Sequence, residues 1–155
     1  DERITRVPAI AFGERRKAKL RFFGIPMGYQ LAVVVENIRT ISRGVSPLRM
    51  DTRKKLRGIN QPVHVQVFVT PTSADCQPVA RLAHALALEN QNITTDVVEI
   101  EEFPALAQQY GVRSVPMTVV NEFTQVAGLV SEAEFVEKIV QWGVRQESES
   151  APVQA

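Results

Sequence analysis

Two apolar segments rich in β-branched residues flank one amphipathic helix, and this order constrains the fold more than any other feature of the chain. Residues 63–69 first alternate between apolar and polar side chains and then become continuously apolar, as a buried strand does. Residues 93–100 are also rich in β-branched side chains. Between them, apolar residues recur at three- and four-residue steps from Cys76 onward, which predicts a helix that ends near Asn90. A strand, a helix and a second strand in immediate succession predict a right-handed crossover between parallel strands.

The segments that follow continue an α/β pattern. Pro104 opens a short helix, and Gly111 stands just past its end. Strands are expected at 117–120 and 123–127, joined by a turn at 121–122. Together these segments predict a hairpin after the second helix.

A capping box of Ser131 and Glu134 marks the start of the last helix. Residues 61–143 are therefore expected to form one complete α/β domain of order β-α-β-α-β-β-α. The polar segment 144–155 is expected to be a disordered tail.

The first sixty residues repeat only the end of that order. Val7-Pro8-Ala9-Ile10 parallels Val115-Pro116-Met117-Thr118, and the run that ends at Gly24 parallels the run that ends at Gly128. An amphipathic run from Tyr29 then parallels the final helix. Residues 1–60 thus predict a ββα half-unit with a basic hairpin loop at 14–19 and a polar linker at 46–60. The opening β-α-β of that unit is absent, so the half-unit either leans on something outside this chain or belongs to a longer protein.

Charge is divided unequally between the two parts. Residues 1–60 hold 14 Lys and Arg against 5 Asp and Glu, and residues 61–155 hold 4 against 12. Such a split points either to an acidic partner or nucleic acid, or to mutual attraction of the two parts. The basic residues fall mainly between apolar strands and no aromatic residues interleave with them, which favours packing of the two parts over a nucleic-acid surface.

Composition excludes several classes of protein. No apolar run reaches 18 residues, so no membrane-spanning helix is expected, and no export signal is visible. A single cysteine excludes an intrachain disulfide framework and a multi-cysteine zinc site. The two histidines, His64 and His84, fall on different predicted elements, so no metal site is expected.

The loop between the first strand and helix of the complete domain is the most promising place for chemistry. Cys76 stands at a helix N-terminus, where free N–H groups and the helix dipole stabilise a thiolate. Thr72 and Ser73 supply hydroxyls that are expected to cap the helix. A second element of the site is Val115-Pro116, because an X-Pro bond at the start of a strand is a place for a cis peptide.

At these positions the chain resembles the two-unit protein disulfide oxidoreductases of thermophilic archaea and bacteria, also called glutaredoxin-like proteins. The resemblance covers nearly the whole chain to about Gly143 and rests on Thr70-Pro71-Thr72, Cys76, Pro78, Ala83-His84, Tyr110-Gly111-Val112, Val115-Pro116 and the segment Gly24–Tyr29. It implies a thioredoxin fold for residues 61–143, preceded by the second half of another thioredoxin-like unit.

One departure from the family pattern decides the chemistry. The family carries a Cys-x-x-Cys motif in which the first cysteine attacks the substrate disulfide and the second resolves the mixed disulfide. This chain has Ser73 at the first position, and a serine hydroxyl has no redox chemistry. The resemblance assigns the catalytic positions to Ser73, Cys76 and Pro116, and the substrate-binding positions to Thr72, Ala74, Asp75 and Val115.

The resemblance predicts a thiol–disulfide oxidoreductase whose dithiol cycling is disabled at Ser73, either naturally or by engineering. One alternative is a redox-inactive binding module on the same fold. Another is a single-thiol activity through Cys76 with glutathione bound near Pro116; otherwise no cofactor is implied. The expected partner is a protein or peptide disulfide, with a further partner or segment completing residues 1–60, and the expected location is the cytoplasm.

Overall fold

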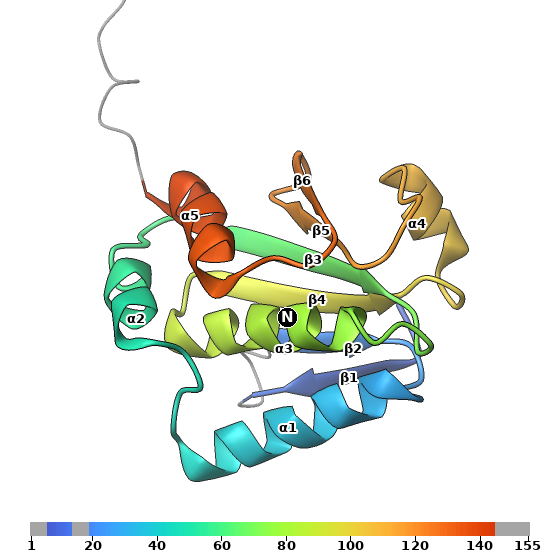
Figure 1. The fold of residues 1–155 in the computed structure, drawn as a ribbon, viewed down its shortest axis with the longest axis horizontal. Helices are drawn as coiled ribbons and strands as arrows, with labels where there is room; N and C mark the ends of the chain where they lie inside the picture. Colours follow the sequence, from blue (N-terminus) through green and yellow to red (C-terminus); the bar gives the residue numbers. More distant parts are fainter. Residues whose placement is uncertain (1–5, 14–18, 145–155) are drawn as a thin grey trace, which may run out of the picture.

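The computed structural model describes residues 6–13 and 19–144, which form a six-stranded mixed sheet with helices on both faces (Figure 1). The strands are β1 (Ala9–Phe12), β2 (Leu20–Phe23), β3 (Val63–Val69), β4 (Ile93–Glu99), β5 (Met117–Val120) and β6 (Thr124–Ala127). The helices are α1 (Tyr29–Arg43), α2 (Met50–Leu56), α3 (Cys76–Glu89), α4 (Pro104–Gln109) and α5 (Glu132–Gly143). The predicted order β-α-β-α-β-β-α is present from β3 to α5.

The sheet has the strand order β1-β2-β4-β3-β5-β6. β3 lies between β4, which is parallel to it with Val67 opposite Val97, and β5, which is antiparallel to it with Phe68 opposite Met117. The crossover through α3 therefore joins neighbouring parallel strands, as the sequence predicts. The end of β3, and the loop that follows it, therefore lies beside the first residue of β5.

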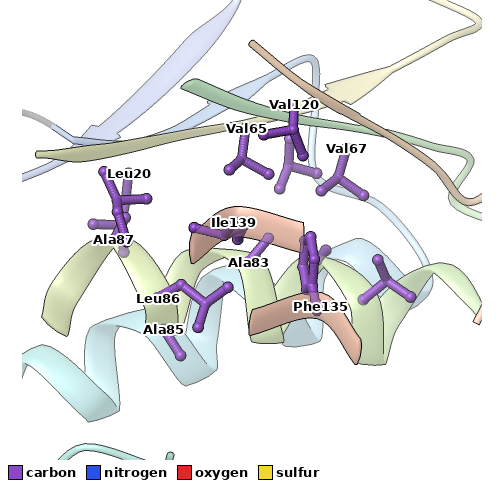
Figure 2. Close-up of a cluster of buried hydrophobic side chains, with 14 of the residues drawn as sticks. Leu20, Val65, Val67, Ala83, Ala85, Leu86, Ala87, Val120, Phe135 and Ile139 are labelled. Atoms are coloured by element: carbon purple, nitrogen blue, oxygen red, sulfur yellow. The ribbon is translucent and has the colours of Figure 1, made fainter. Parts of the chain in front are cut away.

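The main core lies on the sheet face that α3 and α5 cover. Val65 and Val67 of β3 point from the sheet toward Ala83 of α3 and toward Phe135 and Ile139 of α5 (Figure 2). A smaller core lies on the opposite face, where Phe68, Val98 and Met117 pack with Leu106 of α4. The four valines of β3 face the main core, whereas Phe68 faces the smaller core together with the polar His64 and Gln66 on the same side of the strand.

The hairpin repeat predicted from the sequence is present in the structure. The Gly24 N–H donates to the Pro8 carbonyl at 2.9 Å, and the Gly128 N–H donates to the Pro116 carbonyl at the same distance. The peptide bonds before both prolines are cis. These matching contacts make β1-β2-α1 the counterpart of β5-β6-α5.

The half-unit packs on the complete unit and extends its sheet. β2 runs parallel to β4, with Arg21 opposite Asp96. Their side chains form an ion pair at 2.6 Å, and Arg53 pairs with Glu89 at 2.8 Å. The interpretation that the basic and acidic parts pack together is therefore confirmed. No strand of residues 6–13 or 19–144 pairs with the outer edge of β1.

The segment 46–60 is not the plain linker that its polar composition indicates, because it contains α2. Leu48, Leu56 and Ile59 are buried in the main core and hold the helix in place. Tertiary burial of three separated apolar residues thus outweighs the polar local sequence. The predicted basic loop at 14–19, except Lys19, and the predicted tail at 144–155, except Val144, lie outside the described residues.

Candidate active site

The loop between β3 and α3 carries most of the predicted site. Thr72, Ala74 and Asp75 are exposed, and Ser73 is half-buried. The predicted hydroxyl cap is wrong: α3 begins at Cys76 with Asp75 as its N-cap, and no side chain caps the helix. Asp75 has the helical backbone angles φ −68° and ψ −22°, whereas a capping residue has an extended backbone that directs its side chain at the first helical N–H groups. Instead, the Cys76 N–H donates to the Ser73 carbonyl at 3.3 Å.

The thiol of Cys76, the first residue of α3, is closed off from solvent. Cys76 is 0% exposed and belongs to the main core. Ser73, three residues earlier, is the more accessible of the two positions. Of the two positions that the resemblance assigns to disulfide exchange, the more accessible one is a serine and the buried one carries the thiol.

Pro116 lies beside this loop because β5 starts where β3 ends. With Phe68 opposite Met117, the antiparallel register places Pro116 opposite Val69, the last residue of β3. The Val115–Pro116 bond is cis, Pro116 is buried and Val115 is half-buried. Among the described residues, the Val115 backbone has no hydrogen-bond partner. Within the described residues, its N–H and C=O are thus unpaired.

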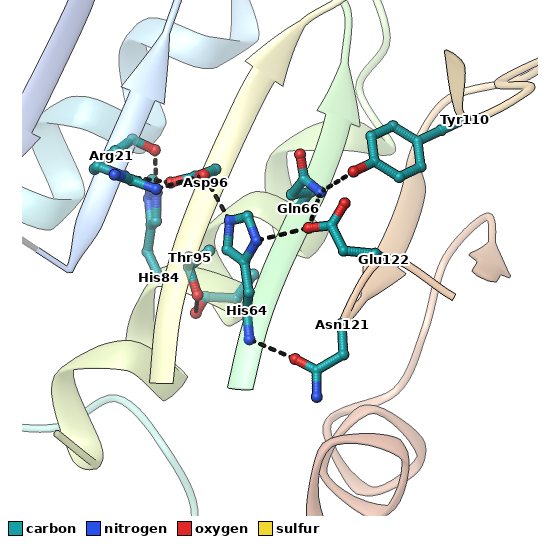
Figure 3. Close-up of polar contacts among 10 residues, drawn as sticks. Arg21, His64, Gln66, His84, Thr95, Asp96, Tyr110, Asn121 and Glu122 are labelled. Carbon is teal, nitrogen blue, oxygen red and sulfur yellow. Dashed lines mark hydrogen bonds and ion pairs between the residues drawn. The ribbon is translucent and has the colours of Figure 1, made fainter. Parts of the chain in front are cut away.

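A second polar cluster lies on the sheet face opposite α3 (Figure 3). The buried Asp96 carboxylate accepts from Arg21 at 2.6 and 2.8 Å and from the His64 Nε2–H at 2.7 Å. The other ring nitrogen of His64 lies 3.1 Å from a Glu122 carboxylate oxygen, and Gln66 donates to the Tyr110 hydroxyl at 3.1 Å. This cluster joins β2 of the half-unit to β3, β4 and the hairpin turn.

The charges in this cluster stabilise one another. Burial alone lowers the pKa of His64, but the hydrogen bonds and charges of Asp96 and Glu122 outweigh burial and raise the pKa above 6.5. Burial alone raises the pKa of Asp96, but His64 and Arg21 outweigh it and hold the pKa below 3.8. No sequence pattern predicted a role for Asp96. The signal that could have identified it is a carboxylate in the middle of a strand rich in β-branched residues.

His84 lies between the half-unit and the complete unit. It is fully buried, and burial lowers its pKa to about 4, so the ring is neutral at pH 7. Its Nε2–H donates to the Arg21 carbonyl at 3.1 Å, and its Nδ1 accepts from the Asn37 amide at 2.6 Å. Both contacts cross from α3 to the half-unit, so His84 links the two units.

Residues 6–13 and 19–144 contain no group of three His, Cys, Asp or Glu side chains that could hold a metal ion. Within the same part of the chain, no helix has the length and apolar character needed to cross a membrane.

Residues 63–141, just over half of the chain, match the thioredoxin domain family. The chain belongs to that family. In solved structures, it is similar to a protein disulfide oxidoreductase from Aeropyrum pernix, with 31% identity and a TM-score of 0.84 over 90% of this chain and 61% of that chain. It is also similar to the NTD_N/C domain of alkylhydroperoxide reductase AhpF from Enterococcus faecalis, with 20% identity and a TM-score of 0.79 over 86% of this chain and 65% of that chain.

A curated relative agrees with this assignment. The AhpF-type alkyl hydroperoxide reductase of Staphylococcus epidermidis is 24% identical over 77% of this chain and 26% of its own length. The chain thus spans about a quarter of that relative. The thioredoxin fold and membership of a thioredoxin-fold oxidoreductase family, both expected from the sequence, are confirmed.

Proposed function

We propose that this thioredoxin domain binds an extended segment of a disulfide-containing polypeptide between Ser73 and Val115, as a thiol–disulfide exchange site whose attacking cysteine is absent. The unpartnered backbone of Val115 beside cis-Pro116 is the observation that supports this proposal most directly. Strand addition to such a backbone gives affinity through main-chain hydrogen bonds and does not require a thiol.

The chemistry that the site lacks is defined by one position. In a complete exchange, a thiolate at position 73 attacks one sulfur of the substrate disulfide, forms a mixed disulfide and releases the first substrate thiolate. The Cys76 thiolate then attacks the mixed disulfide, which releases the second substrate thiol and leaves an intramolecular disulfide for an external dithiol to reduce. Ser73 supplies no thiolate, so the first step does not occur.

The experiment is to measure disulfide reductase turnover of Ser73→Cys beside the unsubstituted chain, with excess dithiol donor. We expect turnover only in the variant, and slower turnover in Ser73→Cys/Cys76→Ser, because there the mixed disulfide must be resolved by the external dithiol. Absence of turnover from Ser73→Cys would refute the exchange-site proposal.

The single-thiol alternative is less well supported. A thiol that forms a glutathione adduct must meet the sulfur of a second molecule, and Cys76 has no exposed surface.

A covering partner for the half-unit is a second part of the proposal. Leu31 and Val35 on α1 are exposed, whereas Phe135 and Ile139, at the same distances from the paired glycines, are buried on α5. This apolar face lies on the half-unit whose β1 edge is unpaired among the described strands, and an apolar strand antiparallel to β1 would cover both. Limited proteolysis tests this idea: we expect residues 6–60 to be cut before residues 61–143, and equal resistance would count against it.

A further inference from the structure

The segment between β2 and α1 lies directly on the active-site loop of the other unit. The Tyr29 N–H donates to the Pro71 carbonyl at 3.1 Å, and the Ile25 N–H donates to a Glu102 carboxylate oxygen at 2.8 Å. A Cβ at Gly28 would lie 2.3 Å from the Pro71 oxygen, so only glycine permits this approach. Hydrogen bonds near both ends of this segment therefore hold it against the loops that follow β3 and β4.

This segment carries large apolar side chains that remain exposed. Ile25 is 53% exposed and Met27 is 54% exposed, while Tyr29 remains partly accessible at the start of α1. Pro71, which the segment covers, is buried only two residues before Ser73. Exposed apolar side chains grouped in this way at a binding site mark an interaction surface.

The sheet order places this segment on the side of the loop opposite Pro116. β5 follows β3 on one side, whereas β4 and then β2 follow on the other. The segment and Pro116 therefore lie on opposite sides of β3 in the strand order. Val115 offers free backbone groups on one side, and Ile25 and Met27 offer apolar side chains on the other.

We infer that Ile25 and Met27 form the second wall of the substrate groove and select polypeptides with apolar residues beside the bound cysteine. This inference rests on the proposed function and adds the specificity that the half-unit provides. The Tyr29 N–H donates to the Pro71 carbonyl two residues before Ser73, so a polypeptide bound at the Ser73–Val115 site passes beside this segment. A small disulfide with no flanking residues touches only the loop and gains nothing from this wall.

The test compares a protein disulfide with a small one in the Ser73→Cys background. Ile25→Gln/Met27→Gln is expected to lower kcat/KM for insulin reduction about tenfold, as removal of ordinary apolar interface contacts does, and to leave hydroxyethyl disulfide reduction unchanged. Leu88→Gln is the matched control, because Leu88 is 41% exposed near the far end of α3 and lies away from Ser73. Equal insulin kinetics in the parent and the double variant would overturn the inference and leave the proposed function intact.

A binding measurement keeps the inference testable if Ser73→Cys shows no turnover. Fluorescence anisotropy of labelled, reduced and alkylated insulin B chain follows binding to the unsubstituted chain, without redox chemistry. We expect the double variant to bind about tenfold more weakly than the Leu88→Gln control. Equal affinity of the two variants, or no binding to the unsubstituted chain, would overturn the inference.

Discussion

Leu31 of α1 and Phe135 of α5 stand seven residues after the paired glycines Gly24 and Gly128, yet Leu31 is 52% exposed and Phe135 is 0% exposed. The helices have the same local pattern and differ in what lies beneath them. α5 packs on β3 and β5, whereas α1 packs beside α3. The different packing partners account for the difference in exposure.

This relationship predicts unequal effects of two equivalent substitutions. Phe135→Ala is expected to lower the free energy of unfolding by about 3–5 kcal/mol, because it leaves a cavity in the main core. Leu31→Ala is expected to lower it by less than about 0.5 kcal/mol, as at other exposed sites. Urea denaturation at low protein concentration measures both changes. A large loss for Leu31→Ala would show that this face is covered in solution.

Asp96 is expected to hold the two parts of the sheet together. Asp96→Asn leaves Arg21 and His64 without their shared buried carboxylate, so the free energy of unfolding should fall by about 3 kcal/mol. Glu122→Gln is the control, because Glu122 is far more exposed and its contact with His64 should contribute less than about 1 kcal/mol. Equal effects in chemical denaturation would contradict the assigned role of Asp96.

The buried His84 predicts a loss of stability on mild acidification. Its pKa is about 4 in the folded chain and 6.5 when exposed, so the unfolded chain takes up the proton first as the pH falls below 6.5. This contribution is fully present above pH 6.5, and about 3 kcal/mol of it is lost by pH 4, at roughly 1.4 kcal/mol per pKa unit. The raised pKa of His64 acts in the opposite direction and only above pH 6.5, where deprotonation removes its stabilising charge.

Denaturation curves between pH 7 and pH 4.5 measure how the free energy of unfolding falls as the pH is lowered. This range lies above the pH at which Asp96 titrates. His84→Gln keeps a hydrogen-bonding side chain but cannot take up a proton, and its profile should be flatter than that of the unsubstituted chain. Identical profiles would contradict burial of a neutral His84.

Gly28 is expected to tolerate no side chain. Gly28→Ala meets both an unfavourable backbone conformation, φ +54°, and the Pro71 carbonyl, so we expect a destabilisation of about 2 kcal/mol or more. Gly44→Ala shares the positive φ of +65° but meets nothing within 4 Å, so it should show only the backbone effect of about 1 kcal/mol. The difference between the two, measured by thermal and urea denaturation, isolates the contact with the active-site loop.

Burial of Cys76 predicts slow modification of the native chain. Ellman's reagent should react with less than one thiol per chain over minutes under native conditions and with the full single thiol in denaturant, because the reaction needs an exposed thiolate. Rapid stoichiometric labelling of the native chain would restore the single-thiol alternative.

The elements of the complete unit and the hairpin repeat were predictable from the amino-acid sequence alone. These features depend on local signals: the spacing of apolar residues from Cys76, the capping box at Ser131, and the prolines and glycines that bound each hairpin. Because such signals act within a few residues, they can be read without the fold.

The contacts between distant segments, in contrast, follow from the three-dimensional fold. Asp96 is a buried ion-pair centre because β2 brings Arg21 beside it, and α2 forms in a polar segment because Leu56 reaches the core. Gly28 lies on the active-site loop because α1 runs beside α3. Each of these contacts joins residues more than 30 positions apart, and their energy depends on burial and charge pairing that no local pattern encodes.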